Sequence, residues 1–582
     1  MRKFGIDLGT TNTCIYCAEF TPNYGMNEED EDDFRLNPVS IRYENTGDMI
    51  NPELSAIMPS AIYARPKKYS DKNEYDFYIG TIAMNLANQD HVAEIINTKR
   101  LICREDPSKK IEYGLTAQDI AQKLLEGCRY TIEKEFGKTR LKASRQCITR
   151  PAAFGLFASR SIHDAGKLAG FPQAEIQSEP IAALLSFLYE ELRDDESAEK
   201  LLKKQAEKGN KLLTLVVDIG GGTTDVTIQE IQISGEKTRK QGDTTCTGYK
   251  INFINLVREG DGPAFTANLN PAFGGYDFDK EIVLNIVKEW DKQYYEAKNK
   301  PLDTQNKIIK DEIAFLYRRV QNYKNSLSRN QNSWTDTVRI DDISLETVWT
   351  PEKFYKWTKH LCISPDEKEE NTRTVYGIIC DTIKRSGYHV NDIDCFFVTG
   401  GMSSYKPVRD LISDKFKDLM NKSVLKFSET PLRDIAMGAA LCNFYFEVKM
   451  PDNVLYADLM IDDPCGEPIV LVEKNTPLPA KGTLENFMVL RNPVYFYIDV
   501  LWGHNTKDCM LKRLRRLRKP IPDKTTSGKV TKIGTKISVE YEIDKNQAMN
   551  ITLKVHDPLG EYTVPLLRLI ETIDLTNGGE LK

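Results

Sequence analysis

The sequence predicts an α/β protein with an internal duplication, followed by an all-β region. Residues 4–13 and 216–225 share an apolar run, an Asp and a turn rich in Gly and Thr. Strand-like and helix-like segments alternate up to about residue 445, which is typical of an α/β fold. After about Met450, short alternating apolar runs separated by Pro, Gly and Asn replace the helical periodicity, and this favours a β-sandwich.

Each copy of the duplicated segment has the pattern of a β-hairpin with a tight turn. Glycines in such a turn let backbone N–H groups converge on an anion, and Thr hydroxyls add further donors. The Asp of each copy, Asp7 or Asp218, can hold a divalent cation that neutralises phosphate charge. Two facing hairpins would therefore grip a polyphosphate from both sides, whereas the alternative is two unrelated turns.

A third segment, residues 395–404, reads as a buried strand that ends in the pair Gly400-Gly401. Paired glycines at a strand end let the backbone approach a flat or bulky ligand closely, although this signal is weak by itself. The sequence contains no GxxxxGK[ST] motif, which argues against a P-loop enzyme.

Together with several other segments, these three resemble the 70-kDa heat-shock chaperone family. The resemblance implies an actin-like ATPase domain of duplicated ribonuclease-H-like architecture, with ATP or ADP and Mg²⁺ as cofactors. The matching segments, in chain order, are residues 6–12, 97–102, 149–154, 178–183, 216–225, 274–279, 400–401 and 433–440.

Length and composition predict a multidomain cytoplasmic protein. The chain has 582 residues, 28% charged and 40% hydrophobic, and a net charge of −6 argues against a general nucleic-acid binder. We expect no secretory leader and no membrane span. The twelve cysteines are scattered and predict reduced, buried thiols. The CxxC of Cys14 and Cys17 falls in a predicted strand, where its side chains point to opposite faces, so we do not expect it to bind metal.

We expect three parts in the chain: a nucleotide-binding domain over 1–447, a linker over 448–457 and a β domain over 458–582. The linker is shorter than in the family and lacks its run of leucines, and the sequence stops where the family continues into a helical lid. Three stretches look like insertions that form surface loops or charged helical segments, namely residues 19–50, 190–211 and 233–270.

The β region continues the resemblance. Residues 473–483 are similar to a signature of the family's peptide-binding domain, and residues 538–556 to its last strand pair. Phe496 and Ile498, with Ile461 opposite, line a peptide site or belong to the core, and the sequence leaves both options open. The basic run 512–519 predicts a solvated loop or a contact with an acidic partner rather than a nucleic-acid site.

The resemblance implies roles for residues around the hairpins. Asp7 and Asp218 would hold Mg²⁺ through its waters. Lys99 matches a catalytic lysine that positions water and stabilises charge on the transferred phosphoryl group. Asp225 and Glu179 would orient the water and the metal shell, unless they are ordinary capping or surface carboxylates. The residues expected at the phosphates are Gly9, Thr10, Thr11, Asn12, Gly220, Gly221, Gly222 and Thr223, the last also counted as catalytic.

On the adenosine side, the sequence departs from the family pattern. Lys324 and Ser328 keep the family's identities, but Gln321 replaces a glutamate and Asn325 an arginine that stacks on the base. After the turn at Gly400-Gly401, Met402 replaces a serine of the family and Ser404 replaces a second stacking arginine. Pro407 lies one position later than the proline of the family pattern. We therefore expect intact phosphate chemistry and altered recognition of the base.

The function that these patterns predict is that of an ATP-hydrolysing, chaperone-like protein that binds extended peptide segments, with possible co-chaperones or nucleotide-exchange factors as partners. One alternative is a nucleotide-sensing scaffold or regulator with little peptide exchange. A small-molecule kinase of the same superfamily and a filament-forming relative of actin are further alternatives, and the C-terminal β region argues against both.

Overall fold

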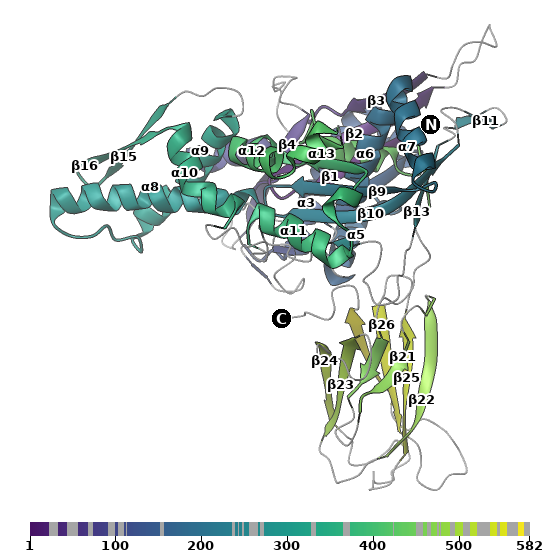
Figure 1. Ribbon diagram of the computed structural model, residues 1–582. Coiled ribbons are helices and arrows are strands. Elements are labelled where there is room, and N and C mark those ends of the chain that lie inside the picture. The colour runs from purple at the N-terminus through teal and green to yellow at the C-terminus, as the bar shows by residue number, and fades with distance from the viewer. Residues whose placement is uncertain are drawn as a thin grey trace. The chain divides into compact units, whose positions relative to one another are not determined.

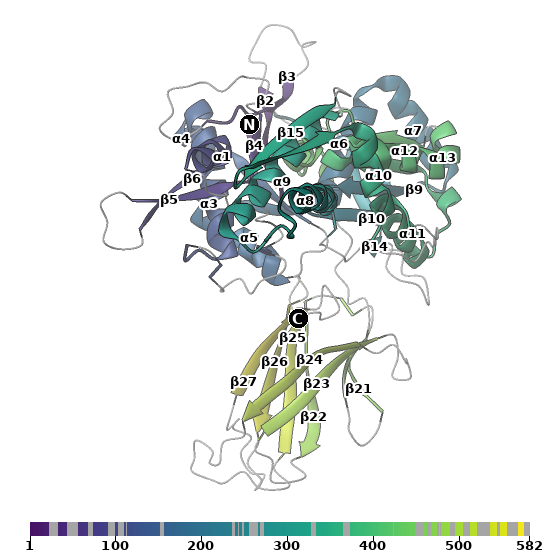
Figure 2. The same cartoon turned by 90° about the vertical axis from the view of Figure 1, so that its left-hand side faces the viewer.

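The structure of the protein is a computed structural model, and Figures 1 and 2 show it from two sides. It divides into two compact units, the first comprising Met1–Ala153 and Arg160–Met450 and the second including Pro451–Lys582. The structure describes residues 1–21, 33–42, 56–67, 74–90, 99, 101–102, 110–111, 113–151, 156–235, 239–241, 244–246, 249–254, 266–267, 273–327, 333–364, 373–422, 424–449, 458–462, 467–473, 476–477, 479–488, 495–503, 512–520, 536–543, 548–555 and 568–574.

The first sheet of unit 1 is mixed, and three of its strands, β1, β7 and β8, point the same way. β1 runs parallel to β7, β7 runs parallel to β8, and β2 pairs antiparallel with β1. In spatial order its strands are β3 (Asp33–Pro38), β2 (Asn12–Thr21), β1 (Arg2–Leu8), β7 (Arg145–Arg150) and β8 (Glu175–Ser178), with β4 (Ile57–Pro59) pairing with β2.

The second sheet repeats this arrangement around a second antiparallel hairpin, β9–β10. All eight residues of β9 are buried, as expected of a central strand covered on both faces. In spatial order its strands are β18 (Leu425–Phe427), β17 (Cys395–Thr399), β9 (Leu212–Ile219), β10 (Thr224–Ser234), β13 (Lys250–Ile254) and β19 (Glu447–Lys449), with β14 (Thr266–Ala267) pairing with β10.

Two helices, α6 (Glu179–Arg193) and α14 (Asp434–Leu441), connect the sheets. α6 contacts strands of both sheets, and α14 packs on α6 and on β1, β2 and β7. Two glycines make this close approach possible. A Cβ at Gly438 would lie 1.7 Å from the Ala182 carbonyl oxygen, and one at Gly5 would lie 2.1 Å from that of Ala436. All of α14 and residues 179–188 of α6 are buried, and both helices belong to one core with the facing strands.

The remaining elements of unit 1 surround the two sheets. Figure 1 shows α8 and α9 beside the hairpin β15–β16, and Figure 2 shows α1, α3, β5 and β6 on the opposite side of the unit from α11 to α13. These helices are α1 (Gly80–Gln89), α3 (Ala117–Phe136), α4 (Lys138–Lys142), α5 (Leu156–Leu168), α7 (Asp195–Glu207), α8 (Gly275–Lys298), α9 (Lys307–Leu327), α10 (Pro351–Cys362), α11 (Val375–Ser386), α12 (Lys406–Lys415) and α13 (Lys417–Asn421), with the 3₁₀ turns η1 (Val390–Asp392) and η2 (Gly401–Ser404). The strand pairs are β5 (Ile62–Pro66) with β6 (Tyr75–Ile79), β11 (Arg239–Gln241) with β12 (Thr244–Cys246), and β15 (Trp334–Ile340) with β16 (Ile343–Trp349).

In the described part of residues 451–582, every element is a strand, and the strands form two four-stranded antiparallel sheets. β24 of the first sheet contacts β27 of the second. The first sheet has the order β21 (Ile469–Val472), β20 (Asp458–Ile461), β23 (Tyr495–Gly503) and β24 (Lys512–Pro520), and the second the order β22 (Ala480–Met488), β25 (Lys536–Ile543), β26 (Ala548–Val555) and β27 (Arg568–Asp574).

Several segments differ from the sequence-based expectation. The basic run 512–519 is not a loop but lies in β24, paired with β23. The expected loop 233–270 contains β13, and the expected insertion 19–50 contributes β3. Local composition missed β3 and β13 because their hydrogen bonds come from partner strands, β2 for β3 and β10 with β19 for β13, which the composition of the segments themselves does not show.

Three further expectations bear on the linker, the insertions and the membrane. The predicted linker begins within β19, whose Val448 pairs with Ile251, and residues 450–457 lie outside the described residues. The charged stretch 190–211 is helical, as predicted, and forms the end of α6 and all of α7. Among the helices in the described part of the chain, none combines the length and apolar character that a membrane span needs.

Candidate active site

The first hairpin, β1–β2, presents the turn Gly9-Thr10-Thr11 at the end of the first sheet, with Asn12 opening β2. A Cβ at Gly9 would lie 2.1 Å from the Asn12 carbonyl oxygen, so the tight turn needs glycine there. Ser60 supports the turn from outside, because its hydroxyl donates to the Gly9 carbonyl (2.7 Å) and its N–H donates to that of Thr11 (2.8 Å).

The second hairpin, β9–β10, has the turn Gly220-Gly221-Gly222-Thr223, which is closed by a hydrogen bond from the Gly220 N–H to the Thr223 carbonyl (2.9 Å). The first turn of α8 is bound to this turn. The Gly275 N–H donates to the Gly220 carbonyl (3.0 Å), and the Tyr276 N–H donates to that of Gly221 (2.6 Å). Helix α8 therefore begins directly on the glycine turn.

The two glycine and threonine turns face each other, as the duplication predicts. A Cβ built on Gly221 would lie 1.9 Å from Thr11 Oγ1, and one on Gly222 would lie 2.6 Å from Thr10 Oγ1. Segments more than 200 residues apart in the sequence thus meet, and only glycine allows so close an approach on the second hairpin.

Beside the turns lies a buried ionic cluster centred on Lys99. Its ammonium forms an ion pair with Glu179 and lies 3.9 Å from Asp7 Oδ1. Lys99 and Glu179 are only 3% exposed. Glu179 is the first residue of α6, where the helix dipole favours a carboxylate. Asp7 is the penultimate residue of β1 and accepts a hydrogen bond from the Thr149 hydroxyl (3.0 Å).

Two further carboxylates, Asp218 and Asp225, face each other across β9 and β10 and enlarge this cluster. Burial raises the pKa of Asp218 well above its usual range, and the charges of Asp225 and Asp7 raise it further. Burial likewise raises the pKa of Asp7 and, more strongly, of Glu179, although the Lys99 ammonium lowers both. The cluster therefore holds more negative than positive charge when all its groups are ionised.

The lysine itself responds in the opposite way. Burial by itself would lower the pKa of Lys99, but the attraction of Glu179 and Asp7 outweighs burial and raises it. Lys99 is consequently a permanent cation at neutral pH.

The Gly400-Gly401 turn also reaches the cluster. Gly400 has φ +83°, and a Cβ there would lie 2.3 Å from Asp218 Oδ1 and 2.5 Å from the Ile219 carbonyl oxygen. Both the left-handed backbone and the lack of space require glycine. Gly401 begins η2, and a Cβ built on it would lie 3.0 Å from Leu432 Cδ2.

The residues expected on the adenosine side are arranged differently from the phosphate side. Lys324 Nζ pairs with Asp279 Oδ1 (2.6 Å) and donates to the Gly275 carbonyl (3.2 Å), and both side chains are about 5% exposed. Gln321 is half-buried one turn earlier on α9, whereas Ser328 and the Asn325 side chain lie outside the described residues. Met402 is buried, next to Gly275.

Three contributing side chains were not singled out from the sequence: Ser60, Thr149 and Asp279. Thr149 and Asp279 lie in segments that carried the family resemblance, but a lone hydroxyl or carboxylate gives no sign of its partner. Ser60 follows the short strand β4 and had no sequence signal. All three contact the site through elements that only the fold brings together.

The charge balance of the cluster fits a divalent cation. Four carboxylates surround one lysine, and the raised pKa values of Asp7, Asp218 and Glu179 show that further positive charge would stabilise their ionised forms. Within the described ranges, no group of three or more His, Cys, Asp and Glu side chains is arranged to ligate a metal directly. A hydrated ion such as Mg²⁺, which keeps several waters, suits this arrangement.

Comparison with known families identifies the part of the chain that carries both hairpins and the cluster. Residues 3–250 match the model of the family described as Hsp70 protein. This family has an actin-like ATPase nucleotide-binding fold, and the mixed α/β architecture of unit 1 agrees with it. The match covers Asp7, Lys99, Glu179, Asp218 and Asp225, and this part of the chain is similar to the Hsp70 family.

Proposed function

We propose that unit 1 binds ATP with Mg²⁺ and hydrolyses it to ADP and phosphate, and that unit 2 binds extended peptide segments of client proteins. The observation that carries the proposal is the buried Lys99 cluster beside two facing turns of glycine and threonine. The Hsp70 family is a chaperone and ATP-binding family, and it generally binds ATP or ADP with Mg²⁺.

The facing turns supply the donors for the phosphates. Apart from Gly220, whose N–H closes its own turn, their glycines let an anion approach the backbone N–H groups without a Cβ in the way, and Thr10, Thr11 and Thr223 add hydroxyls. Asn12 of the first hairpin extends this set. Such preorganised donors stabilise charge that develops on a transferred phosphoryl group, because they do not have to reorient during the reaction.

The ionic cluster supplies the catalytic groups. Lys99, permanently charged, would stabilise the phosphoryl group as it leaves, while Glu179 and Asp225 orient the attacking water. Asp7 and Asp218 would hold a hydrated Mg²⁺, which neutralises phosphate charge when bound. The ion pair of Lys99 with Glu179 keeps the ammonium in place beside Asp7.

For unit 2, we propose that its two sheets pack as a sandwich and present a peptide site. Ile461 on β20 is buried and opposite Val500 of β23 in the register, while the side chains of Phe496 and Ile498 lie outside the described ones. Backbone hydrogen bonds and a few apolar pockets would supply the affinity. Co-chaperones or exchange factors are the expected partners, and the cytoplasm is the proposed compartment, in accord with the buried thiols of cysteines such as Cys14, Cys128 and Cys147.

Steady-state ATP hydrolysis by the full chain, with and without an unfolded peptide, tests the proposal. We expect Mg²⁺-dependent turnover that peptide stimulates. Lys99→Ala should reduce the rate about 10²–10³-fold while nucleotide still binds. Lys406→Ala is the matched control, because Lys406 pairs with Asp410 on the surface and should leave the rate unchanged. Parental turnover by the Lys99 variant would contradict the assignment.

A second candidate function is a nucleotide-sensing scaffold with little peptide exchange. It is favoured by the adenosine side, where Lys324 is engaged with Asp279 and Met402 is buried beside Gly275. Tight nucleotide binding with turnover that no peptide stimulates would favour this function over the chaperone.

A further inference from the structure

A buried carboxylate that has no part in the proposed mechanism lies next to the Gly400-Gly401 turn. Asp434 is 2% exposed and is the first residue of α14. Its Oδ2 accepts a hydrogen bond from the hydroxyl of Thr399, the last residue of β17, and its Oδ1 accepts one from the Thr430 hydroxyl (2.8 Å). Among the described residues, the hydrogen-bond partners of Asp434 are therefore hydroxyl groups rather than a cation.

Thr399 connects this carboxylate to the proposed metal site. In the parallel pairing of β17 with β9, Thr399 lies opposite Asp218. The next residue is Gly400, where a Cβ would lie 2.3 Å from Asp218 Oδ1. Because the turn lies directly against the Asp218 carboxylate, a shift of Thr399 would displace the surface on which that carboxylate rests. Asp434 therefore holds the strand end that supports Asp218.

The loop before α14 is bound to the same strand end. The Ser428 N–H donates to the Val398 carbonyl (2.9 Å), and the Thr430 N–H donates to the Ser428 hydroxyl (2.9 Å). Leu432 packs on the turn, since a Cβ built on Gly401 would lie 3.0 Å from Leu432 Cδ2. The buried carboxylate thus ties the loop and the strand end together beside the turn.

The charge of Asp434 also acts on the ionic cluster. Burial is the main cause of the raised pKa of Asp218, the charges of Asp225 and Asp7 raise it further, and the charge of Asp434 adds to them. Burial raises the pKa of Asp434 itself, although hydrogen bonds from three hydroxyls lower it. When ionised, Asp434 increases the negative potential at Asp218, and this favours a bound cation.

A purely structural role would not require these contacts. A carboxylate in the first turn of a helix is stabilised by the helix dipole without any particular partner. The oxygens of Asp434 instead bind hydroxyls of the strand end and of the loop, and Arg433, at the N-cap of α14, makes no side-chain cap. The geometry of Asp434 therefore serves the turn as well as the helix.

We propose that Asp434 is a positioning residue that holds the Gly400-Gly401 turn against Asp218 and thereby raises the affinity of the site for nucleotide with Mg²⁺. The inference rests on the nucleotide site proposed above. Asp434 acts through the Thr399 hydroxyl and the turn rather than by contact with the ligand. Residues that orient a metal-binding carboxylate in this way typically contribute about 10–100-fold to metal affinity.

Calorimetric binding of ADP to the full chain, with Mg²⁺ and with EDTA, tests the inference. The quantity compared is the Mg²⁺ preference, the ratio of the two dissociation constants. Asp434→Asn and Thr399→Val should each lower this preference about tenfold, while the affinity for ADP in EDTA stays close to the parental value. Thr399→Ser keeps the hydroxyl and should keep the parental preference.

The effects of the two substitutions should not add. Both act on the same hydrogen bond, so the double variant Thr399→Val/Asp434→Asn should lose no more Mg²⁺ preference than Asp434→Asn does. Thr399→Val keeps the shape of the side chain and decides the question if Asp434→Asn fails to fold. A parental preference in Thr399→Val, or additive losses in the double variant, would overturn the inference.

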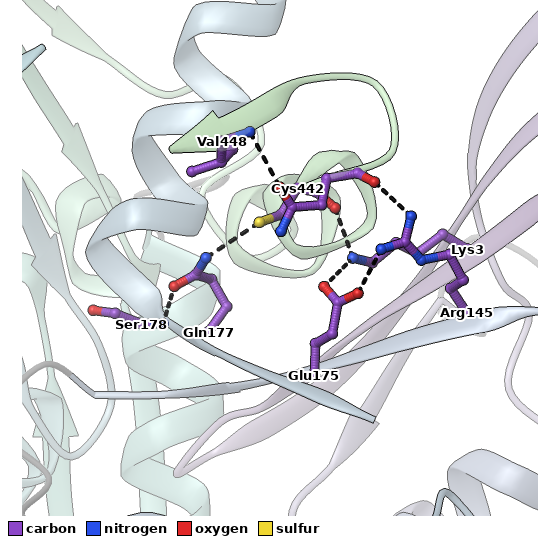
Figure 3. A network of polar contacts seen from close by, with 8 residues as sticks. Lys3, Arg145, Glu175, Gln177, Ser178, Cys442 and Val448 are labelled. Carbon is purple, nitrogen blue, oxygen red and sulfur yellow. Dashed lines mark hydrogen bonds and ion pairs between the residues drawn. The ribbon is translucent and has the colours of Figure 1, made fainter. Parts of the chain in front are cut away.

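A variant at the other end of α14 separates positioning from the stability of the helix. There the Lys3 ammonium donates to the Cys442 carbonyl and to Glu175 Oε2, both at 2.6 Å (Figure 3). Glu175→Gln should lower the Tm, as Asp434→Asn does, but should leave the Mg²⁺ preference unchanged. If Glu175→Gln lowers the preference as much as Asp434→Asn, the effect belongs to helix stability and the positioning role is wrong.

The outcomes separate this inference from the proposed function. If ADP does not bind the parental protein with Mg²⁺ or with EDTA, the proposed function fails and the positioning role fails with it. If ADP binds and the Asp434 and Thr399 variants keep the parental Mg²⁺ preference, the positioning role is wrong and the proposed function stands. Binding of ADP to the parental protein that does not respond to Mg²⁺ would also overturn the positioning role.

Discussion

The Lys99–Glu179 ion pair offers the sharpest test of the cluster, through the substitution Lys99→Met. The lysine side chain is 3% exposed and lies 3.9 Å from Asp7 Oδ1 in addition to its pair with Glu179. At an effective dielectric constant of about 20, one pair at that distance attracts by about 4 kcal/mol. Removing one partner of a buried pair typically costs about 3–5 kcal/mol, because the other charge stays buried without a counter-ion.

The cost should depend on pH, because Glu179 can escape its unpaired charge by binding a proton. Burial raises the pKa of Glu179 well above its usual range, and losing Lys99 removes the main opposing influence. The folded variant then binds this proton more tightly than the unfolded chain, so it gains stability as the pH falls through that pKa. We expect the full cost at pH 8 and a clearly smaller one at pH 5.

Urea denaturation followed by tryptophan fluorescence measures this cost in unit 1, where Trp290 and Trp349 are fully buried. The double variant Lys99→Met/Glu179→Gln is the control, and it should recover much of the stability at pH 8. A cost below about 1 kcal/mol at pH 8, or one that is the same in the Glu179→Gln background, would refute the reasoning.

Three further outcomes are expected. ATP and GTP should bind within about tenfold of each other by calorimetry, because Asn325 and Ser404 replace two stacking arginines worth roughly 0.5–2 kcal/mol each; a much larger preference for ATP would contradict this. Mg²⁺ should raise the Tm more at pH 8 than at pH 5, because the buried carboxylates with raised pKa values are ionised to a greater extent at pH 8; equal shifts would argue against a cation there. Gly400→Ala should lower the free energy of unfolding by more than the about 1–3 kcal/mol that a strained backbone costs, because the new Cβ would also clash with Asp218. Gly114→Ala, at φ +74° with open space around it, should lower it by the strain alone. Urea denaturation measures both changes.

The sequence predicted the α/β class of unit 1 and the two hairpins because these features are local. An apolar run that ends in Asp and a Gly-Thr turn defines a hairpin without knowledge of its surroundings. β3, β13 and β24 were missed because a strand is stabilised by its partner strand, which the composition of the segment itself does not show: β3 pairs with β2, β13 with β10 and β19, and β24 with β23. The six Lys or Arg residues of β24 favoured a solvated loop in the sequence, although the segment is a strand that is hydrogen-bonded to β23.

For the site, the sequence by itself determined the chemical groups: the aspartates near the end of the first strand of each hairpin, the glycine turns, and Lys99 through its family context. Only the tertiary structure decided that Lys99 pairs with Glu179, that Thr149 holds Asp7 and that Lys324 is engaged with Asp279. The physical reason is that pairing, burial and pKa depend on distances of a few ångströms between side chains that are tens to hundreds of residues apart. The hydrogen bond from the Lys3 ammonium to the Cys442 carbonyl belongs to the same class, since a lysine near the start of a strand gives no sign that its partner lies 439 residues later.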